Sequence, residues 1–165
     1  MKRPLMPLAL FLALAAASAR AQAGFEGRLR VPERLSGARG ALASADSRLA
    51  LRDYEGAITE ADRALAASPD DPEALYFRAA AENMLGRYAD AARDATRGLI
   101  AAPSDAGLLD LRARAYARMG RHESALADAE RALELDPRDS YARTNRARAR
   151  EALGLEAPLP APSAG

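Results

Sequence analysis

The sequence has no cysteine and no tryptophan, one histidine, and a single lysine at Lys2. Without cysteine, the chain cannot form disulfides, use thiol chemistry or bind a metal through thiolates. Without a lysine after residue 2, it offers none for a Schiff base or for a phosphate-binding loop. Aromatic residues make up 5% of the chain while apolar residues make up 49%, much of it alanine. A core of this composition depends on close approach of helices rather than on a few large side chains.

The formal net charge of +1 is carried by the N-terminal segment. Lys2, Arg3 and Arg20 are three of the 24 basic residues, so the rest of the chain has 21 against 23 acidic residues. A body with this balance is not drawn to nucleic acid or to anionic membrane by electrostatics alone. We therefore expect no nucleic-acid partner.

Residues 1–23 have the pattern of a signal peptide. Lys2 and Arg3 precede the apolar run Leu5–Ala17, and the small-x-small pattern predicts cleavage near Ala21 or Ala23. The run is shorter than the ~20 residues that span a bilayer. The sequence thus predicts a periplasmic or secreted protein with no membrane insertion once the signal is removed.

A 34-residue period governs the middle of the chain, as Pro69, Pro103 and Pro137 show. Ungapped repetition of this kind predicts a solenoid. The predicted domain covers residues 38–154, between a linker at 24–37 and a disordered, proline-rich tail at 155–165. Its units are expected at 38–71, 72–105 and 106–139, with a capping helix at 140–154.

Each unit is predicted to contain two helices. Gly86 and Gly120 mark the turn between them, where positive φ favours glycine, and Arg52 takes that place in the first unit. Aspartates precede the later first helices and are expected to cap them. First helices are expected at 38–50, 72–84 and 106–118, second helices at 54–67, 88–101 and 122–135, and the caps at Asp71, Asp105 and Asp139.

The units resemble tetratricopeptide repeats (TPRs) of an exported bacterial type. The shared features are the period, the proline near the end of each unit and small residues at fixed points, namely Ala45, Ala79, Ala113, Ala57, Ala91, Ala125, Ala61, Ala95, Ala129, Ala64, Gly98 and Ala132. The resemblance implies an all-α, right-handed TPR solenoid of three helix-turn-helix repeats plus a C-terminal capping helix.

The same resemblance implies a concave groove lined by the first helices. A groove with apolar residues at its centre and arginines at one end suits an extended peptide with apolar anchors and either an acidic group or a C-terminal carboxylate. The alternative is that Phe77 and Leu111 belong to the core and the arginines form a solvated face. The predicted partner-binding residues are Tyr76, Phe77, Asn83, Asp110, Arg114, Arg118 and Arg148.

One TPR subfamily holds the acidic tails of cytosolic chaperones in a clamp of lysines, asparagines and an arginine. The corresponding positions here carry none of these residue types, so the resemblance does not extend to that function. They are Leu42, Asp46, Phe77, Gly107 and Leu111.

Opposite charges also recur with the period on neighbouring helices. We expect a ladder of ion pairs between repeats, formed by Glu60 with Arg78, Asp94 with Arg112, and Asp128 with Arg146.

The predicted function is a non-catalytic adaptor that binds a partner protein or peptide in the concave groove. The alternative is a structural subunit of a cell-envelope complex, or a homo-oligomer, that assembles through convex or end surfaces. No enzyme activity, cofactor or metal is expected, since His122 occupies the packing position of Tyr54 and Tyr88. The partner and the oligomeric state stay open.

Overall fold

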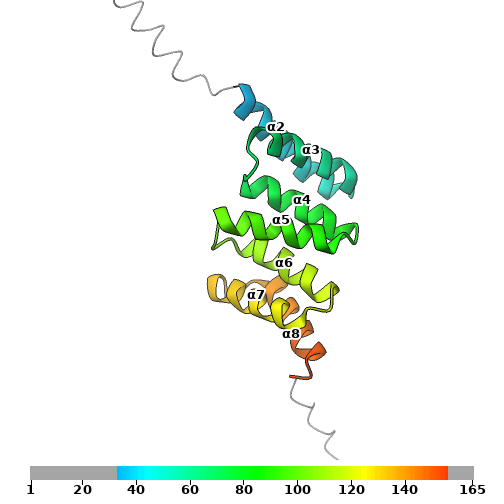
Figure 1. Cartoon of the computed structure of the whole chain (residues 1–165), viewed down its shortest axis with the longest axis vertical. Helices are drawn as coiled ribbons and strands as arrows, with labels where there is room; N and C mark the ends of the chain where they lie inside the picture. Colours follow the sequence, from blue (N-terminus) through cyan, green and yellow to red (C-terminus); the bar gives the residue numbers. More distant parts are fainter. Residues whose placement is uncertain (1–32, 156–165) are drawn as a thin grey trace, which may run out of the picture. The chain divides into compact units, whose positions relative to one another are not determined.

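The computed structural model describes the backbone of residues 33–155 and the side chains from residue 37 onward. The predicted signal peptide, the proline-rich tail after residue 155 and most of the linker lie outside this range. Figure 1 shows the described helices stacked in chain order. They are α2 (Glu33–Ala50), α3 (Tyr54–Ala67), α4 (Pro72–Met84), α5 (Tyr88–Ala101), α6 (Ala106–Arg118), α7 (His122–Leu135) and α8 (Ser140–Ala152).

Helices α3 to α7 begin and end at the predicted residues. Helix α2 begins at Glu33, before the predicted start at Ala38, and therefore includes the last part of the predicted linker. It continues through Gly37 and Gly40 because a glycine in a helix costs only about 1 kcal/mol relative to alanine. No helix in the described range is both long enough and apolar enough to span a bilayer.

Aspartates begin three of the first helices, as predicted. The carboxylate of Asp71 accepts from the backbone N–H of Glu73, that of Asp105 from Leu108 and that of Asp139 from Tyr141. Each bond satisfies one of the N–H groups that a helix start leaves without a partner. The first helices of successive units are therefore fixed by the same local chemistry.

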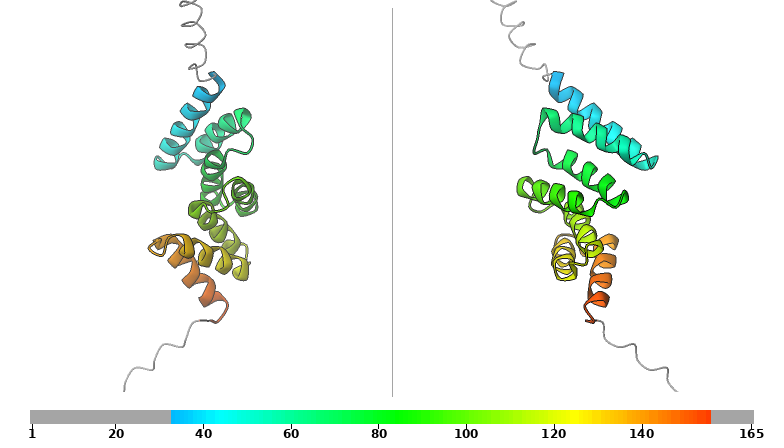
Figure 2. Two further views of the ribbon diagram at one scale, coloured as in Figure 1. Left: turned by 90° about the vertical axis from the view of Figure 1, so that its left-hand side faces the viewer. Right: turned by 45° about the vertical axis from the view of Figure 1, so that its right-hand side comes forward.

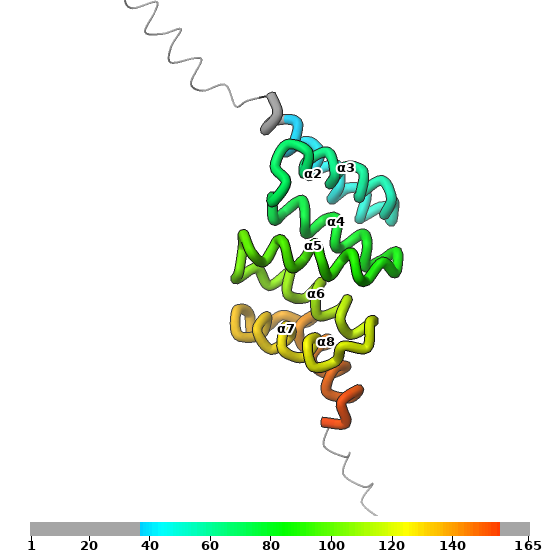
Figure 3. The backbone as a smooth tube through the Cα atoms, in the orientation of Figure 1, coloured from blue at the N-terminus to red at the C-terminus, as the bar shows by residue number. Residues whose placement is uncertain are grey.

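The turns inside the units need a left-handed residue. Gly86 and Gly120 have φ of 79° and 77°, and Gly154 ends α8 with φ of 68°. In the first unit this position is Arg52, with φ of 61°. The less typical first turn predicted from the sequence is thus confirmed, and Figure 3 shows the path of the backbone through it.

The core is built from alanine, as the composition predicted. The largest fully buried side chains are Leu75, Leu108 and Leu109, and most other buried apolar residues are alanines. Close approach is visible where α5 meets α6, since a Cβ added to Gly98 would lie 2.7 Å from Cδ1 of Leu108. Figure 2 shows the closely stacked helices from two further sides.

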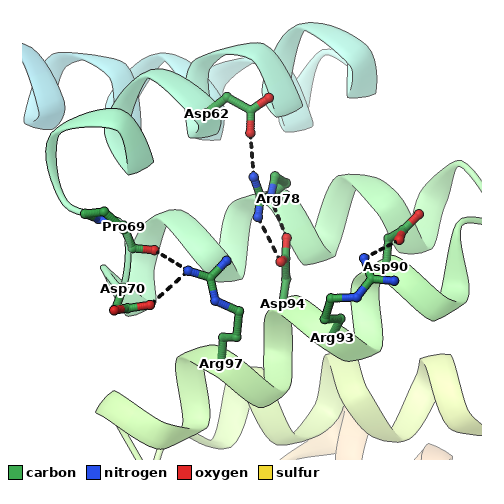
Figure 4. Close-up of polar contacts among 8 residues, drawn as sticks. All are labelled: Asp62, Pro69, Asp70, Arg78, Asp90, Arg93, Asp94 and Arg97. Carbon is green, nitrogen blue, oxygen red and sulfur yellow. Dashed lines mark hydrogen bonds and ion pairs between the residues drawn. The ribbon is translucent and has the colours of Figure 1, made fainter.

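The predicted ion-pair ladder exists with a different register. The guanidinium of Arg78 binds Asp94 of its own repeat, at 2.8 Å from Nη2, and Asp62 of the preceding repeat, at 2.6 Å from Nη1 (Figure 4). Arg112 repeats this arrangement with Asp128 and with the hydroxyl of Thr96. The expected pairs of Glu60 with Arg78, Asp94 with Arg112, and Asp128 with Arg146 are wrong.

The reason is the antiparallel packing of two helices within one unit. Each of these arginines lies 16 residues from its partner on either side along the chain, so it bridges the second helix before it and the second helix after it. Glu60 instead binds Arg63 and Arg48.

A second set of contacts with the repeat period joins neighbouring units. Arg97 Nη2 donates to the carbonyl of Pro69 at 2.9 Å, and Arg131 Nη2 donates to the carbonyl of Pro103 at 3.2 Å. Figure 4 shows the first of these, where Arg97 also binds Asp70. The turns after the first and second repeats are thus each held by the second helix of the next repeat.

Candidate functional site

The first helices of the solenoid form one wall around a groove of about 780 Å³. The groove is lined by residues of α4, α6 and α8, by the end of α2, by the turn that follows it and by the first residue of α3. Helix α6 packs against both α4 and α8, so adjacent first helices supply a continuous floor. Of the predicted binding residues, the groove brings together Tyr76, Asp110, Arg114 and Arg148.

Tyr76 lines the groove from α4. A Cβ added to Gly107 would be 2.9 Å from Cε2 of Tyr76, so the ring rests on the glycine backbone of α6. Burial raises the pKa of Tyr76, with further contributions from Asp105, Tyr141 and other nearby groups. The phenol therefore stays neutral and offers a hydrogen-bonding group within an aromatic surface.

Phe77 does not line the groove. It packs against the first part of the core, which includes Leu42 and Leu75, and its ring meets that of Tyr76 edge to face with centroids 5.6 Å apart. Phe77 therefore belongs to the core, as the alternative interpretation of the sequence stated. It supports Tyr76 from behind.

A pair of carboxyl groups lies in the wall between α6 and α8. Asp110 is 9% exposed, and Nδ2 of Asn145 donates to its Oδ1 at 3.4 Å. Burial, together with the hydrogen bond and negative charge of Asp139, raises the pKa of Asp110 to about 7. Asp139 keeps its charge, because the N–H groups of Ala142 and Tyr141 and the Asp110 carboxyl outweigh its burial and lower its pKa.

Arginines lie where the first helices end. Arg114 and Arg148 are exposed and occupy equivalent positions of α6 and α8, and Arg52 lies in the turn after α2. Within residues 37–155, none of the three forms an ion pair with a carboxylate. This edge of the groove therefore carries positive charge that is not neutralised by the described protein.

The other predicted residues gather in a smaller hollow of about 190 Å³. Asn83 and Arg118 line it together with Met84, Tyr88 and Arg114. Since Met84 and Arg114 also line the groove, the two spaces adjoin. The guanidinium of Arg118 lies 5.1 Å from the centroid of the Tyr88 ring, and Nη2 of Arg114 lies 3.4 Å from Sδ of Met84.

Asn83 has a structural contact that the sequence did not indicate. It is 3% exposed, and its Nδ2 donates to the backbone carbonyl of Leu111 at 3.0 Å, which ties α4 to α6. Its Oδ1 is buried and has no hydrogen-bond partner.

The groove residues that sequence reasoning missed include Arg52, Tyr54, Met84 and Asp139, the last of which was predicted only as a helix cap. Tyr54 begins a second helix, where a packing role was expected. The only signal for Arg52 was the absence of glycine at its turn. Within the part of the chain that the structure describes, no group of three or more His, Asp or Glu side chains is placed to hold a metal ion.

Comparison with known proteins places the fold. Family models described as "Tetratricopeptide repeat" match residues 42–106 and 106–139, together more than half of the chain. No curated protein sequence matches the chain.

Among solved structures, the TPR domain of Arabidopsis OM64 is similar, with a TM-score of 0.69 and 19% identity over 72% of this chain and 98% of that one. A thermophilic TPR protein of Thermus thermophilus has a TM-score of 0.66 and 26% identity over 72% and 66%. The second TPR domain of human RPAP3, solved with an HSP70 peptide, has a TM-score of 0.67 and 23% identity over 71% and 98%.

The three repeats, the capping helix, both family models and these structural likenesses agree: this chain belongs to the tetratricopeptide repeat family.

Proposed function

We propose that the protein is an exported, non-catalytic adaptor that binds an extended, acidic segment of a partner protein in the concave groove. The observation that carries this proposal is the edge of the groove formed by Arg52, Arg114 and Arg148. These guanidinium groups are exposed and lack carboxylate partners among the described residues, while Tyr76 offers a half-buried aromatic surface beside them.

The spacing of the arginines defines the segment further. Arg114 and Arg148 occupy equivalent positions on packed helices, whose axes lie about 8–10 Å apart. An extended peptide rises about 3.3 Å per residue. Two acidic side chains about three residues apart therefore match the two guanidinium groups, each of which can bind a carboxylate through two N–H groups.

The fold is shared with peptide-binding domains such as the one from human RPAP3. At 23% identity this likeness concerns the fold alone. The partner chemistry proposed here rests on the groove residues of this chain, which differ from the chaperone clamp described above.

The test is capture of a partner by the full-length protein and by its variants. Tyr76→Ala and Arg114→Glu are expected to abolish capture while the circular dichroism spectrum keeps its helical form. Arg146→Glu is the matched control, because Arg146 is exposed on α8 and does not line the groove. Capture that survives both groove variants contradicts the proposal. If the molecular mass of the purified protein also rises with its own concentration, the protein assembles as a structural subunit instead.

Export is a separate part of the proposal. The charged start, the apolar run and the small-x-small pattern near Ala21 and Ala23 support it. Mass spectrometry of the protein recovered from a bacterial host should show a new N-terminus near these residues in the periplasmic or secreted fraction. An intact Met1 in the cytoplasmic fraction contradicts export.

A further inference from the structure

Asn83 lines the hollow beside the groove, and its side chain has a buried acceptor without a donor. Nδ2 of Asn83 donates to the carbonyl of Leu111 at 3.0 Å. Because a backbone carbonyl only accepts, this bond fixes which end of the amide is nitrogen and leaves Oδ1 as the buried atom without a partner. A buried acceptor of this kind destabilises the fold, so it calls for a functional explanation.

Two donors border the same hollow. The guanidinium groups of Arg114 and Arg118 line it, and neither forms an ion pair with a carboxylate in the described part of the chain. Arg118 lies over the ring of Tyr88, and Arg114 contacts the thioether of Met84. The lining of this hollow of about 190 Å³ therefore brings together Asn83, whose acceptor lacks a donor, the N–H donors of two arginines and the apolar surface of Met84 and Tyr88.

This combination separates three classes of ligand group. A carboxylate would accept hydrogen bonds from the arginines. It has no hydrogen to donate to Asn83 Oδ1, so its lone pairs would lie near those of that oxygen. An ammonium or guanidinium group would satisfy Asn83 but would meet the positive charge of Arg114 and Arg118. A neutral amide has an N–H for Asn83 and a carbonyl for the arginines.

We propose that this hollow binds a neutral amide of the bound segment, from a glutamine or asparagine side chain or from a peptide bond. The amide N–H donates to Oδ1 of Asn83, and its carbonyl accepts from Arg114 or Arg118. The inference rests on the proposed function in one respect: the hollow adjoins the groove through Met84 and Arg114, so one segment can occupy both.

Access to the acceptor requires a lining side chain to move, because Oδ1 has almost no contact with solvent. Met84 is 45% exposed and unbranched, and such a thioether repacks at low cost. The volume of the hollow equals that of several water molecules at about 30 Å³ each, which is enough for a carboxamide group.

The experiment uses the full-length protein labelled with ¹⁵N and three small probes, the N-acetyl methylamides of glutamine, glutamate and alanine. The side-chain amide resonance of Asn83 is expected to shift in a saturable way with the glutamine probe, at least tenfold more tightly than with the glutamate probe. Equal binding of the alanine probe would identify the peptide bond as the source of the amide. Binding of the glutamate probe as tight as that of glutamine while the alanine probe binds more weakly, or no shift at Asn83 with any probe, overturns the inference.

Two substitutions of exposed arginines test the inference without disturbing the fold. Arg118→Gln changes an exposed residue and is expected to weaken the glutamine probe at least fivefold, whereas Arg146→Gln, outside the hollow, is expected to leave it unchanged. Equal affinity in both variants also overturns the inference. Since the probes need no partner protein, failure here is distinct from failure of the groove to capture a partner.

Discussion

Arg112 binds Asp128 through two hydrogen bonds, from Nε to Oδ2 and from Nη2 to Oδ1, each 2.8 Å long. The side chains are 21% and 10% exposed, so the pair lies at the boundary of the core. Two parallel bonds of this kind are directional as well as strong. They fix the angle between α6 and α7 within the third repeat.

We predict that Asp128→Ala destabilises the fold because it leaves the Arg112 charge half-buried without its partner. The expected loss is about 2–3 kcal/mol, less than the 3–5 kcal/mol of a fully buried pair. Urea unfolding followed by circular dichroism measures it. Asp90→Ala, which breaks an exposed pair with Arg93, is the control and should cost less than about 1 kcal/mol.

Glu82 is the opposite case, a buried acid without a partner for Oε2. Burial, and then the negative charge of Asp94, raises its pKa to about 7. The folded state thus holds a proton that the unfolded state releases above its ordinary pKa near 4.5. We predict that this group makes stability fall as the pH rises from about 4.5 to about 7, because the unfolded state then binds fewer protons.

Replacing Glu82 by glutamine removes that contribution. The variant should be more stable than the native protein at pH 8, by about 1–3 kcal/mol, and the difference should shrink at pH 5. Urea midpoints at the two pH values measure this. A constant difference between the proteins across this range would contradict the assignment of the slope to Glu82.

Asp110, which lines the groove, also has a raised pKa. Its pKa of about 7 means that it is mostly neutral at pH 6 and mostly charged at pH 8. We predict that an acidic partner segment binds more weakly at pH 8, by about fivefold, since one added negative charge costs on the order of 1 kcal/mol nearby. Binding by Asp110→Asn should be independent of pH over this interval, and an equal pH dependence in both proteins would rule out Asp110 as its source.

A substitution at Gly107 is expected to change partner affinity while leaving the stability of the fold almost unchanged. We predict that Gly107→Ala lowers partner affinity at least tenfold, because its Cβ would lie 2.9 Å from Cε2 of Tyr76 and force the ring to move. Stability should change by less than about 1 kcal/mol, since alanine favours the helix by a similar amount. Gly40→Ala on α2, where a Cβ meets nothing within 4 Å, should leave affinity unchanged. Titration calorimetry and thermal unfolding give the two quantities.

The sequence was sufficient for the architecture because local rules determine it. The prolines, the turn glycines and the capping aspartates recur every 34 residues, and each acts on the backbone within a few positions of itself. The boundaries of α3 to α7 follow directly from them. Helix α2 begins earlier than predicted, because glycine weakens a helix without ending it, and α8 ends at Ala152, before the predicted end at 154.

The contacts between helices could not be predicted in the same way. A 34-residue period shows that Arg78 and Asp94 recur, but both the correct and the incorrect pairing share that period, and only packing distinguishes them. Asn83 is similar, since its amide could equally face the groove or a backbone carbonyl of the next helix. Side-chain direction across an interface depends on the crossing geometry of two helices.

Arg52 has the left-handed backbone that glycine adopts at the equivalent turns, and its side chain lines the groove. A residue with a Cβ in this conformation costs on the order of 1 kcal/mol or more. Arg52→Gly would therefore make the first turn more regular while removing a charge from the ligand edge. At this turn, the protein keeps a less stable backbone and, with it, a longer row of positive charge along the groove.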